Sequence, residues 1–115
     1  MAQRNQQFTA SRDVIIRTKA WIEAVKYYES VLGLTVTHRG KNVVGLEAGG
    51  LCLYVENGEQ QGPVLELLVS DVAAAKARLL SAGCSLVEED ASVPRCYVRD
   101  PYGLTYNIGL DRRRP

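Results

Sequence analysis

One charged residue interrupts an otherwise apolar stretch of the chain. Glu66 is the single polar residue in the run 64–69, which otherwise consists of valine and leucine. A carboxylate in such a run must be paired or hydrated, because burying an isolated charge is very unfavourable. Two interpretations stay open. Glu66 contacts a ligand or acts as a general base, or it forms a structural ion pair with Arg17 or with an arginine across a dimer interface.

Other residues that could take part in catalysis or metal binding lack the neighbouring groups that such a role requires. His38 is the only histidine, and we interpret it as a surface residue. Cys52 would be a nucleophile only beside a base that forms its thiolate, and we interpret it as inert. The cysteines Cys52, Cys84 and Cys96 are widely spaced without a C-x-x-C pattern, so neither a disulfide framework nor a zinc site is indicated.

Composition places the chain among ordinary globular proteins. It has 115 residues, 46% apolar and 23% charged, with a net charge of +1, which gives no support to a general role in nucleic-acid binding. No segment approaches the ~20 apolar residues of a membrane span. The polar N-terminus does not resemble a signal peptide. We therefore expect a cytoplasmic protein without nucleic-acid or membrane partners.

Apolar periodicity and turn residues predict the elements that hold these side chains. A helix is expected over 20–32, with Ile22, Val25, Tyr28 (or Glu29) and Leu32 on its buried stripe and Gly33 as its C-cap. A second helix is expected over 72–82, capped by Ser70 or Asp71 and ended by Gly83. Strands are expected over 13–17, 34–39, 41–47, 51–55, 63–69, 85–89, 95–99 and 104–108, with a polar loop over 56–62.

The predicted elements read β-α-β-β-β twice. The glycines that end the two helices, Gly33 and Gly83, are 50 residues apart, and the turn glycines Gly50 and Gly103 are 53 apart. A repeat of this kind predicts two similar modules whose sheets combine into one curved surface, each backed by its helix.

Three short motifs in this order resemble a known family. They are the run 24–34 (AVKYYESVLGL), the bounds of the second helix at 69–72 and 82–83, and the turn Asp100-Pro101-Tyr102-Gly103. Together they resemble the glyoxalase/bleomycin-resistance group, the vicinal oxygen chelate superfamily. The resemblance implies an α+β fold of paired βαβββ modules, which form a curved, partly open mixed sheet with the helices outside.

The domain boundaries follow from this repeat and its resemblance. We expect a single domain over 13–110, with module one over 13–56 and module two over 63–110. Residues 1–12 are expected to be a flexible arm, and residues 111–115 a basic tail. The resemblance also implies a homodimer.

Enzymes of the superfamily bind a divalent metal through four equivalent strand positions, usually His or Gln in the first strands and Glu in the last strands. Carried over to this chain, the positions are Asp13, Tyr54, Val64 and Asn107. Valine has no donor atom, and Asn and Tyr are poor ligands for the metals that prefer His and carboxylate. We therefore predict that there is no metal and no other cofactor.

Strand alternation predicts which side chains line the cavity instead. This lining is mixed in polarity, as in most small-molecule pockets. The predicted ligand-binding residues are Asp13, Arg17, Cys52, Tyr54, Val64, Glu66, Leu68, Thr105 and Asn107.

Three functional hypotheses remain open. The preferred one is a metal-free protein that binds a small organic molecule, in the manner of the antibiotic-resistance proteins that it resembles. The second is a divalent-metal-dependent lyase, isomerase or dioxygenase with an atypical ligand set such as Asp13, Glu66 and Glu56 or His38. The third is a metal-free enzyme in which Glu66 is the catalytic acid or base.

Overall fold

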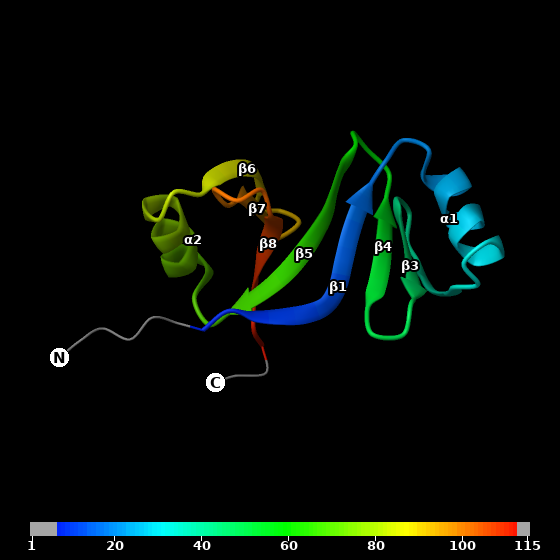
Figure 1. Ribbon diagram of the computed structural model, residues 1–115, viewed down its shortest axis with the longest axis horizontal. Helices are drawn as coiled ribbons and strands as arrows, with labels where there is room; N and C mark the ends of the chain where they lie inside the picture. Colours follow the sequence, from blue (N-terminus) through cyan, green and yellow to red (C-terminus); the bar gives the residue numbers. More distant parts are fainter. Residues whose placement is uncertain (1–6, 113–115) are drawn as a thin grey trace. The chain divides into compact units, whose positions relative to one another are not determined.

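The structure is a computed structural model that describes residues 7–112. Eight strands and two helices follow one another in these residues (Figure 1). Their bounds are β1 (Thr9–Arg17), α1 (Trp21–Ser30), β2 (Thr35–Arg39), β3 (Val43–Glu47), β4 (Cys52–Glu56), β5 (Gln61–Val69), α2 (Val72–Ser81), β6 (Ser85–Asp90), β7 (Arg95–Arg99) and β8 (Thr105–Leu110).

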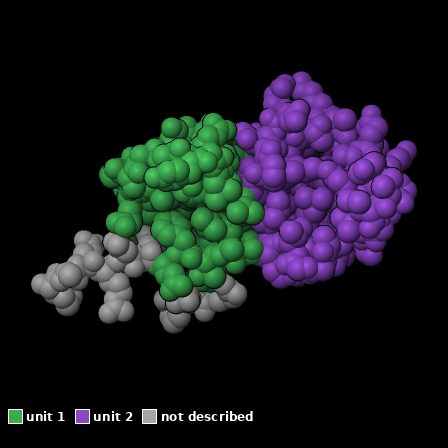
Figure 2. All heavy atoms as spheres, in the orientation of Figure 1, with its two compact units in different colours: residues 1–11, 65–115 green, residues 12–64 purple. Residues whose placement is uncertain are grey.

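The chain divides into two compact units, coloured separately in Figure 2. Unit 1 contains residues 65–115 with 1–11, and unit 2 contains residues 12–64. In unit 2 the strand order is β2-β3-β4-β1, and in unit 1 it is β5-β8-β7-β6. The pairs β1/β4 and β5/β8 are parallel, and the other neighbours within each unit are antiparallel. Helix α1 packs on β4, and α2 packs on β8. The predicted α+β fold with its repeated βαβββ pattern is confirmed.

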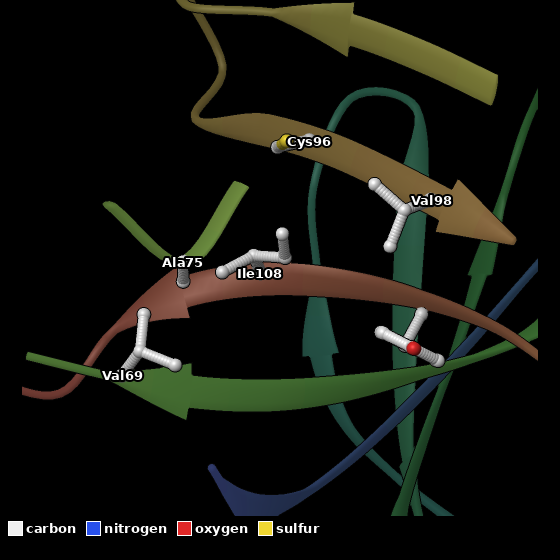
Figure 3. Close-up of a cluster of buried hydrophobic side chains, with 6 residues drawn as sticks. Val69, Ala75, Cys96, Val98 and Ile108 are labelled. Atoms are coloured by element: carbon white, nitrogen blue, oxygen red, sulfur yellow. The ribbon is translucent and has the colours of Figure 1, made fainter. Parts of the chain in front are cut away.

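The core of unit 1 lies between α2 and one face of the sheet. Figure 3 shows its buried side chains from four elements: Val69 of β5, Ala75 of α2, Cys96 and Val98 of β7, and Ile108 of β8. The half-buried Leu65 and Leu67 pack against this cluster. Since side chains alternate along a strand, the helix-facing positions of β5 and β8 leave Glu66 and Asn107 on the opposite face, as predicted.

The core of unit 2 differs from the prediction in how α1 faces it. Val25 is buried, and Trp21 and Tyr28 pack against the cluster, whereas Ile22 and Leu32 are 55% and 56% exposed. The predicted stripe is therefore wrong at both of its ends. The structural reason is that α1 begins only at Trp21 and ends at Ser30, so Leu32 lies beyond the helix, and the core stripe runs through Trp21 and Val25.

The ends of the helices largely follow the prediction. Asp71 caps α2 by accepting a hydrogen bond from the Ala74 backbone N–H at 3.0 Å. Gly33 and Gly83 have φ of +73° and +105°, a left-handed conformation that glycine adopts without a steric penalty.

The predicted flexible arm is wrong for its last part. Thr9–Arg12 belong to β1, because the strand begins four residues before Asp13. Residues 1–6, and residues 113–115 of the predicted basic tail, lie outside the described residues, whereas Asp111 at the start of that tail is buried.

Both outer strands carry an irregularity at the same place in the repeat. The register of β2 shifts between Val36 and His38, and that of β6 shifts between Leu86 and Glu88. Such bulges twist a strand, and on an exposed edge they hinder pairing with another chain.

Neither α1 nor α2, the helices of the described residues, is long and apolar enough to cross a membrane.

Candidate functional site

The face of unit 1 that points away from α2 brings Glu66, Asn107 and Tyr97 together. Glu66 pairs in register with Asn107 across β5 and β8, and Asn107 pairs with Tyr97 across β8 and β7. Residues directly opposite each other in neighbouring strands project from the same face of a sheet. The structure thus places two of the predicted site residues, Glu66 and Asn107, side by side.

Asn107 is buried, and both ends of its side-chain amide are used. Its Oδ1 accepts a hydrogen bond from the Cys96 backbone N–H at 2.8 Å, and its Nδ2 donates to Glu66 Oε2 at 3.4 Å. Because a backbone N–H can only donate, the contact with Cys96 fixes which end of the amide is the oxygen. The amide N–H₂ group is consequently turned toward the carboxylate of Glu66.

The backbone pairing of β7 with β8 ends at Tyr97 and Asn107, and the side-chain amide of Asn107 takes the place of the next backbone acceptor. Paired residues run from Arg99 and Thr105 to Tyr97 and Asn107. The next inward N–H of β7 belongs to Cys96, and the Asn107 side chain accepts its hydrogen bond. Beyond this point the two strands separate (Figure 3).

A cavity of about 450 Å³ opens at this end of unit 1. Its apolar walls come from the start of α2, the turn before β7 and the end of β8, and four charged side chains reach it. The lining residues are Glu66, Val72, Glu89, Ala91, Pro94, Arg95, Cys96, Ile108, Gly109, Leu110 and Arg112.

Gly109 makes room for the carboxylate of Glu66. A Cβ atom built on residue 109 would lie 3.0 Å from Glu66 Oε2 and 3.5 Å from its carboxyl carbon. The carboxylate therefore lies across the glycine, in space that a larger residue would fill. Strand alternation places Gly109 on the same face as Asn107, and a glycine at such a position is a signal of close approach by another group.

The remaining predicted residues of β5 and β8 have structural surroundings. Val64 is 1% exposed and carries no polar atom, and Leu68 is half-buried. Thr105 is buried, and its Oγ1 accepts a hydrogen bond from Arg99 Nε at 3.2 Å.

In unit 2, the face opposite α1 carries Asp13, Arg17, Cys52 and Tyr54. Asp13 pairs with Cys52 across β1 and β4, and Arg17 pairs with Glu56. Arg17 also forms an ion pair with Glu56 (Nη1–Oε1, 3.8 Å) and donates from Nε to the Glu59 carbonyl oxygen at 2.9 Å. The structure thus gives Arg17 a local partner in Glu56.

Tyr54 lies on a glycine in the neighbouring strand. A Cβ atom on Gly45 would lie 2.8 Å from the Tyr54 ring, and the ring of the exposed His38 stands edge-on at 6.5 Å between centroids. His38 is thus a surface residue, as predicted, but it contacts a predicted site residue.

Glu47 organises the polar groups beside Cys52, and sequence reasoning missed it. Its carboxylate accepts hydrogen bonds from Arg12 Nη2 at 2.6 Å, from the Gly49 N–H at 3.1 Å and from Cys52 Sγ at 3.5 Å. The Arg12 hydrogen bond holds the pKa of Glu47 below its usual value. Burial and then the hydrogen bond to Glu47 raise the pKa of Cys52, so its thiol stays protonated at neutral pH.

We expect Asp13→Asn to stabilise the protein slightly at pH 7. Burial raises the pKa of Asp13 above its ordinary value of 3.8, against the opposing effect of Arg12. The folded state therefore disfavours the ionised form, and this penalty acts above the folded-state pKa and vanishes as pH falls below the unfolded-state value. The gain should be less than about 1 kcal/mol after solvent screening.

Urea unfolding of Asp13→Asn at pH 7 and pH 3 tests this expectation. Asp90→Asn is a control of opposite sign, since hydrogen bonds from Ser92 lower the pKa of Asp90. The stability that Asp90 contributes is present at pH 7 and is lost as pH falls through its folded-state pKa. A loss of stability at pH 7 in Asp13→Asn would contradict the assignment.

The side chains at the four positions that the resemblance assigns to metal binding offer few donor atoms. Val64 has no donor atom, and Asn107 uses its oxygen for the Cys96 N–H. Within residues 7–112, no group of three or more His, Cys, Asp and Glu side chains is placed to hold a metal ion. Tyr54 and Asp13 alone would be a weak donor set.

The sequence pattern of the glyoxalase-like domain matches residues 13–109. The chain belongs to the glyoxalase-like domain family. This match extends from Asp13 in β1 to Gly109 in β8, so both βαβββ repeats of this glyoxalase-like protein are part of it. No curated protein sequence matches the chain significantly.

Solved structures with the same fold include enzymes of two kinds. Homoprotocatechuate 2,3-dioxygenase from Brevibacterium fuscum, in complex with 3,4-dihydroxyphenylacetate, has a TM-score of 0.65 and 20% identity, over 92% of this chain and 37% of that chain. Methylmalonyl-CoA epimerase from Mycobacterium tuberculosis has a TM-score of 0.62 and 17% identity, over 97% of this chain and 95% of that chain. The glyoxalase-like chain thus spans little more than a third of the dioxygenase. At these identities the likeness shows the fold alone.

Proposed function

We propose that the glyoxalase-like protein binds a small organic molecule on the polar face of its sheet, without a catalytic metal. The hydrogen bonding of Asn107 carries the proposal. At a position where the resemblance implies a metal-binding glutamate, this amide is buried, and its oxygen accepts the Cys96 N–H. The neighbouring cavity has apolar walls and a few polar groups, the usual composition of a small-molecule pocket.

The test is the metal and ligand content of the purified protein. We expect elemental mass spectrometry to find no stoichiometric metal, with or without added Zn²⁺, Ni²⁺, Mn²⁺ or Fe²⁺. We expect native mass spectrometry to find an organic adduct that denaturation releases. Stoichiometric metal that is lost in the double variant Asp13→Asn/Glu66→Gln would overturn the proposal in favour of a metal-dependent lyase, isomerase or dioxygenase.

A matched control separates ligand loss from a general effect of charge. Glu23 and Glu29 are exposed on α1, so Glu23→Gln/Glu29→Gln removes two carboxylates that are not among the candidate site residues. Metal lost equally in both double variants would indicate nonspecific surface binding.

Homodimerisation, antibiotic resistance and a cytoplasmic location stay predictions. Light scattering after size-exclusion chromatography tests homodimerisation.

A second candidate function is metal-free acid–base catalysis by Glu66. The observation that favours it is the Asn107 amide, which is fixed by Cys96 and turned toward the carboxylate. A positioned carboxylate beside a cavity is a geometry that a general base requires. An activity lost in Glu66→Gln, with ligand affinity retained, would support catalysis over binding.

A further inference from the structure

The cavity of unit 1 is lined by four residues with charged side chains, two of each sign, and two of them form ion pairs with neighbouring residues. Arg95 Nη1 lies 2.9 Å from Glu88 Oε2, and its guanidinium carbon lies 5.4 Å from the centroid of the Tyr97 ring. Lys76 Nζ lies 2.8 Å from each carboxylate oxygen of Glu89. These groups are neutralised locally and offer a ligand little net charge.

Glu66 differs from the other carboxylate of the cavity. Within residues 7–112, its side-chain hydrogen bond comes from the neutral amide of Asn107, and at 3.4 Å that bond is long. The side chain is half-buried, so its negative charge is less screened than a charge in open solvent. Arg112 also lines the cavity, but it is exposed, and water weakens its effect.

The surroundings of Glu66 are built for a group that approaches from the cavity. Asn107 orients the carboxylate from one side, and the missing side chain of Gly109 makes room for the carboxylate at the cavity wall. Apolar residues, among them Val72, Ile108 and Leu110, make up the uncharged part of the wall. A ligand that is complementary to both the Glu66 carboxylate and the apolar wall has a positively charged nitrogen on an apolar body.

We propose that this cavity binds an organic cation, a protonated amine on an apolar or aromatic body, with Glu66 as its counter-ion. This inference rests on the proposed function and specifies the ligand class of the same site. The ammonium group would donate hydrogen bonds to the Glu66 carboxylate, and the apolar body would lie against the accessible parts of Val72 and Leu110. Asn107 is a positioning residue that holds the carboxylate toward the cavity.

Three probes of nearly equal shape test the charge requirement. We would titrate the full chain at pH 7 with benzylamine, benzyl alcohol and benzoate, and follow the backbone amides of Cys96, Gly109 and Leu110 by ¹H–¹⁵N NMR. We expect saturable benzylamine binding at least about ten-fold tighter than that of benzyl alcohol, because charged hydrogen bonds are stronger than neutral ones. Benzoate should bind most weakly.

A variant of the counter-ion and a matched control locate the effect. Glu66→Gln should weaken benzylamine binding by about ten-fold or more and leave benzyl alcohol unchanged. Glu89→Gln removes a charge from the same cavity, but that carboxylate already pairs with Lys76, so a change of at most about two-fold is expected.

Gly109→Ala tests position rather than charge. Its Cβ would press on Glu66 Oε2, so we expect benzylamine to bind more weakly although the charge remains. Gly50→Ala is the control, since a Cβ there meets nothing within 4 Å. Unchanged amide spectra away from the cavity would show that each variant is folded.

The outcomes separate the two proposals. Benzylamine binding that is absent, equal to that of benzyl alcohol, or undiminished in Glu66→Gln overturns the cation inference. The proposed function still stands in that case if native mass spectrometry finds a bound organic molecule. Absence of any organic adduct, together with no saturable binding of the three probes, overturns both.

Discussion

Replacement of Asn107 by leucine is expected to lower the free energy of unfolding by about 1–3 kcal/mol. Leucine has the same branching at Cγ as asparagine and is larger, so it leaves no cavity, but it removes the acceptor of the Cys96 N–H. That bond is 2.8 Å long and buried, and an unsatisfied buried donor costs its full desolvation. The donor to Glu66 is lost in the same variant.

Chemical unfolding of Asn107→Leu beside the unaltered protein measures this loss. Asn57→Leu is the matched control, because Asn57 is exposed and its change should stay within about 0.5 kcal/mol. Hydrogen exchange gives a second readout, since the Cys96 amide should lose protection in Asn107→Leu. Equal stability of the two variants would show that the Asn107–Cys96 hydrogen bond is not structural.

We expect Leu46→Ala to cost about 3 kcal/mol of stability. Leu46 of β3 is fully buried, at 0% exposed, in the cluster of Val25, Val44 and Val55. Truncation loses the transfer free energy of the removed carbons and leaves a cavity that the surrounding side chains fill only in part. The effect should be among the largest for a single substitution in unit 2.

Leu51→Ala provides the comparison for the core of unit 2. Leu51→Ala is the same substitution at a position that is 38% exposed. We expect it to lower the free energy of unfolding by less than half as much as Leu46→Ala. Thermal unfolding by circular dichroism suffices for both variants. Similar costs at the two positions would mean that the packing of β3 against α1 contributes less than its burial implies.

The repeat in the sequence determines much of the fold. Gly33 and Gly83 end equivalent helices, and the structure gives both a positive φ. The alternation in β5 and β8 correctly separates Leu67 and Ile108, which face α2, from Glu66 and Asn107. These predictions succeed because period-two alternation and left-handed caps are local properties, written in adjacent residues.

The helix stripe shows where local pattern fails. Ile22 and Leu32 fit the spacing of a buried face as well as Trp21 and Val25 do, yet both are more than half exposed. Spacing defines the direction of an apolar stripe only to within a residue, and contact with β4 selects among the alternatives. The start of β1 at Thr9 was likewise invisible in a polar sequence, because pairing with neighbouring strands defines a strand.

For the site, the sequence by itself determined residue types: a carboxylate in an apolar run, and Val64 and Asn107 where metal ligands are expected. Only the tertiary structure decided what these groups do. The Asn107 amide accepts a hydrogen bond from the Cys96 N–H and donates one to Glu66, and Gly109 lies against the Glu66 carboxylate. Arg17 forms an ion pair with Glu56. Hydrogen-bond direction and open space depend on strands far apart in the chain, and no single stretch of sequence encodes them.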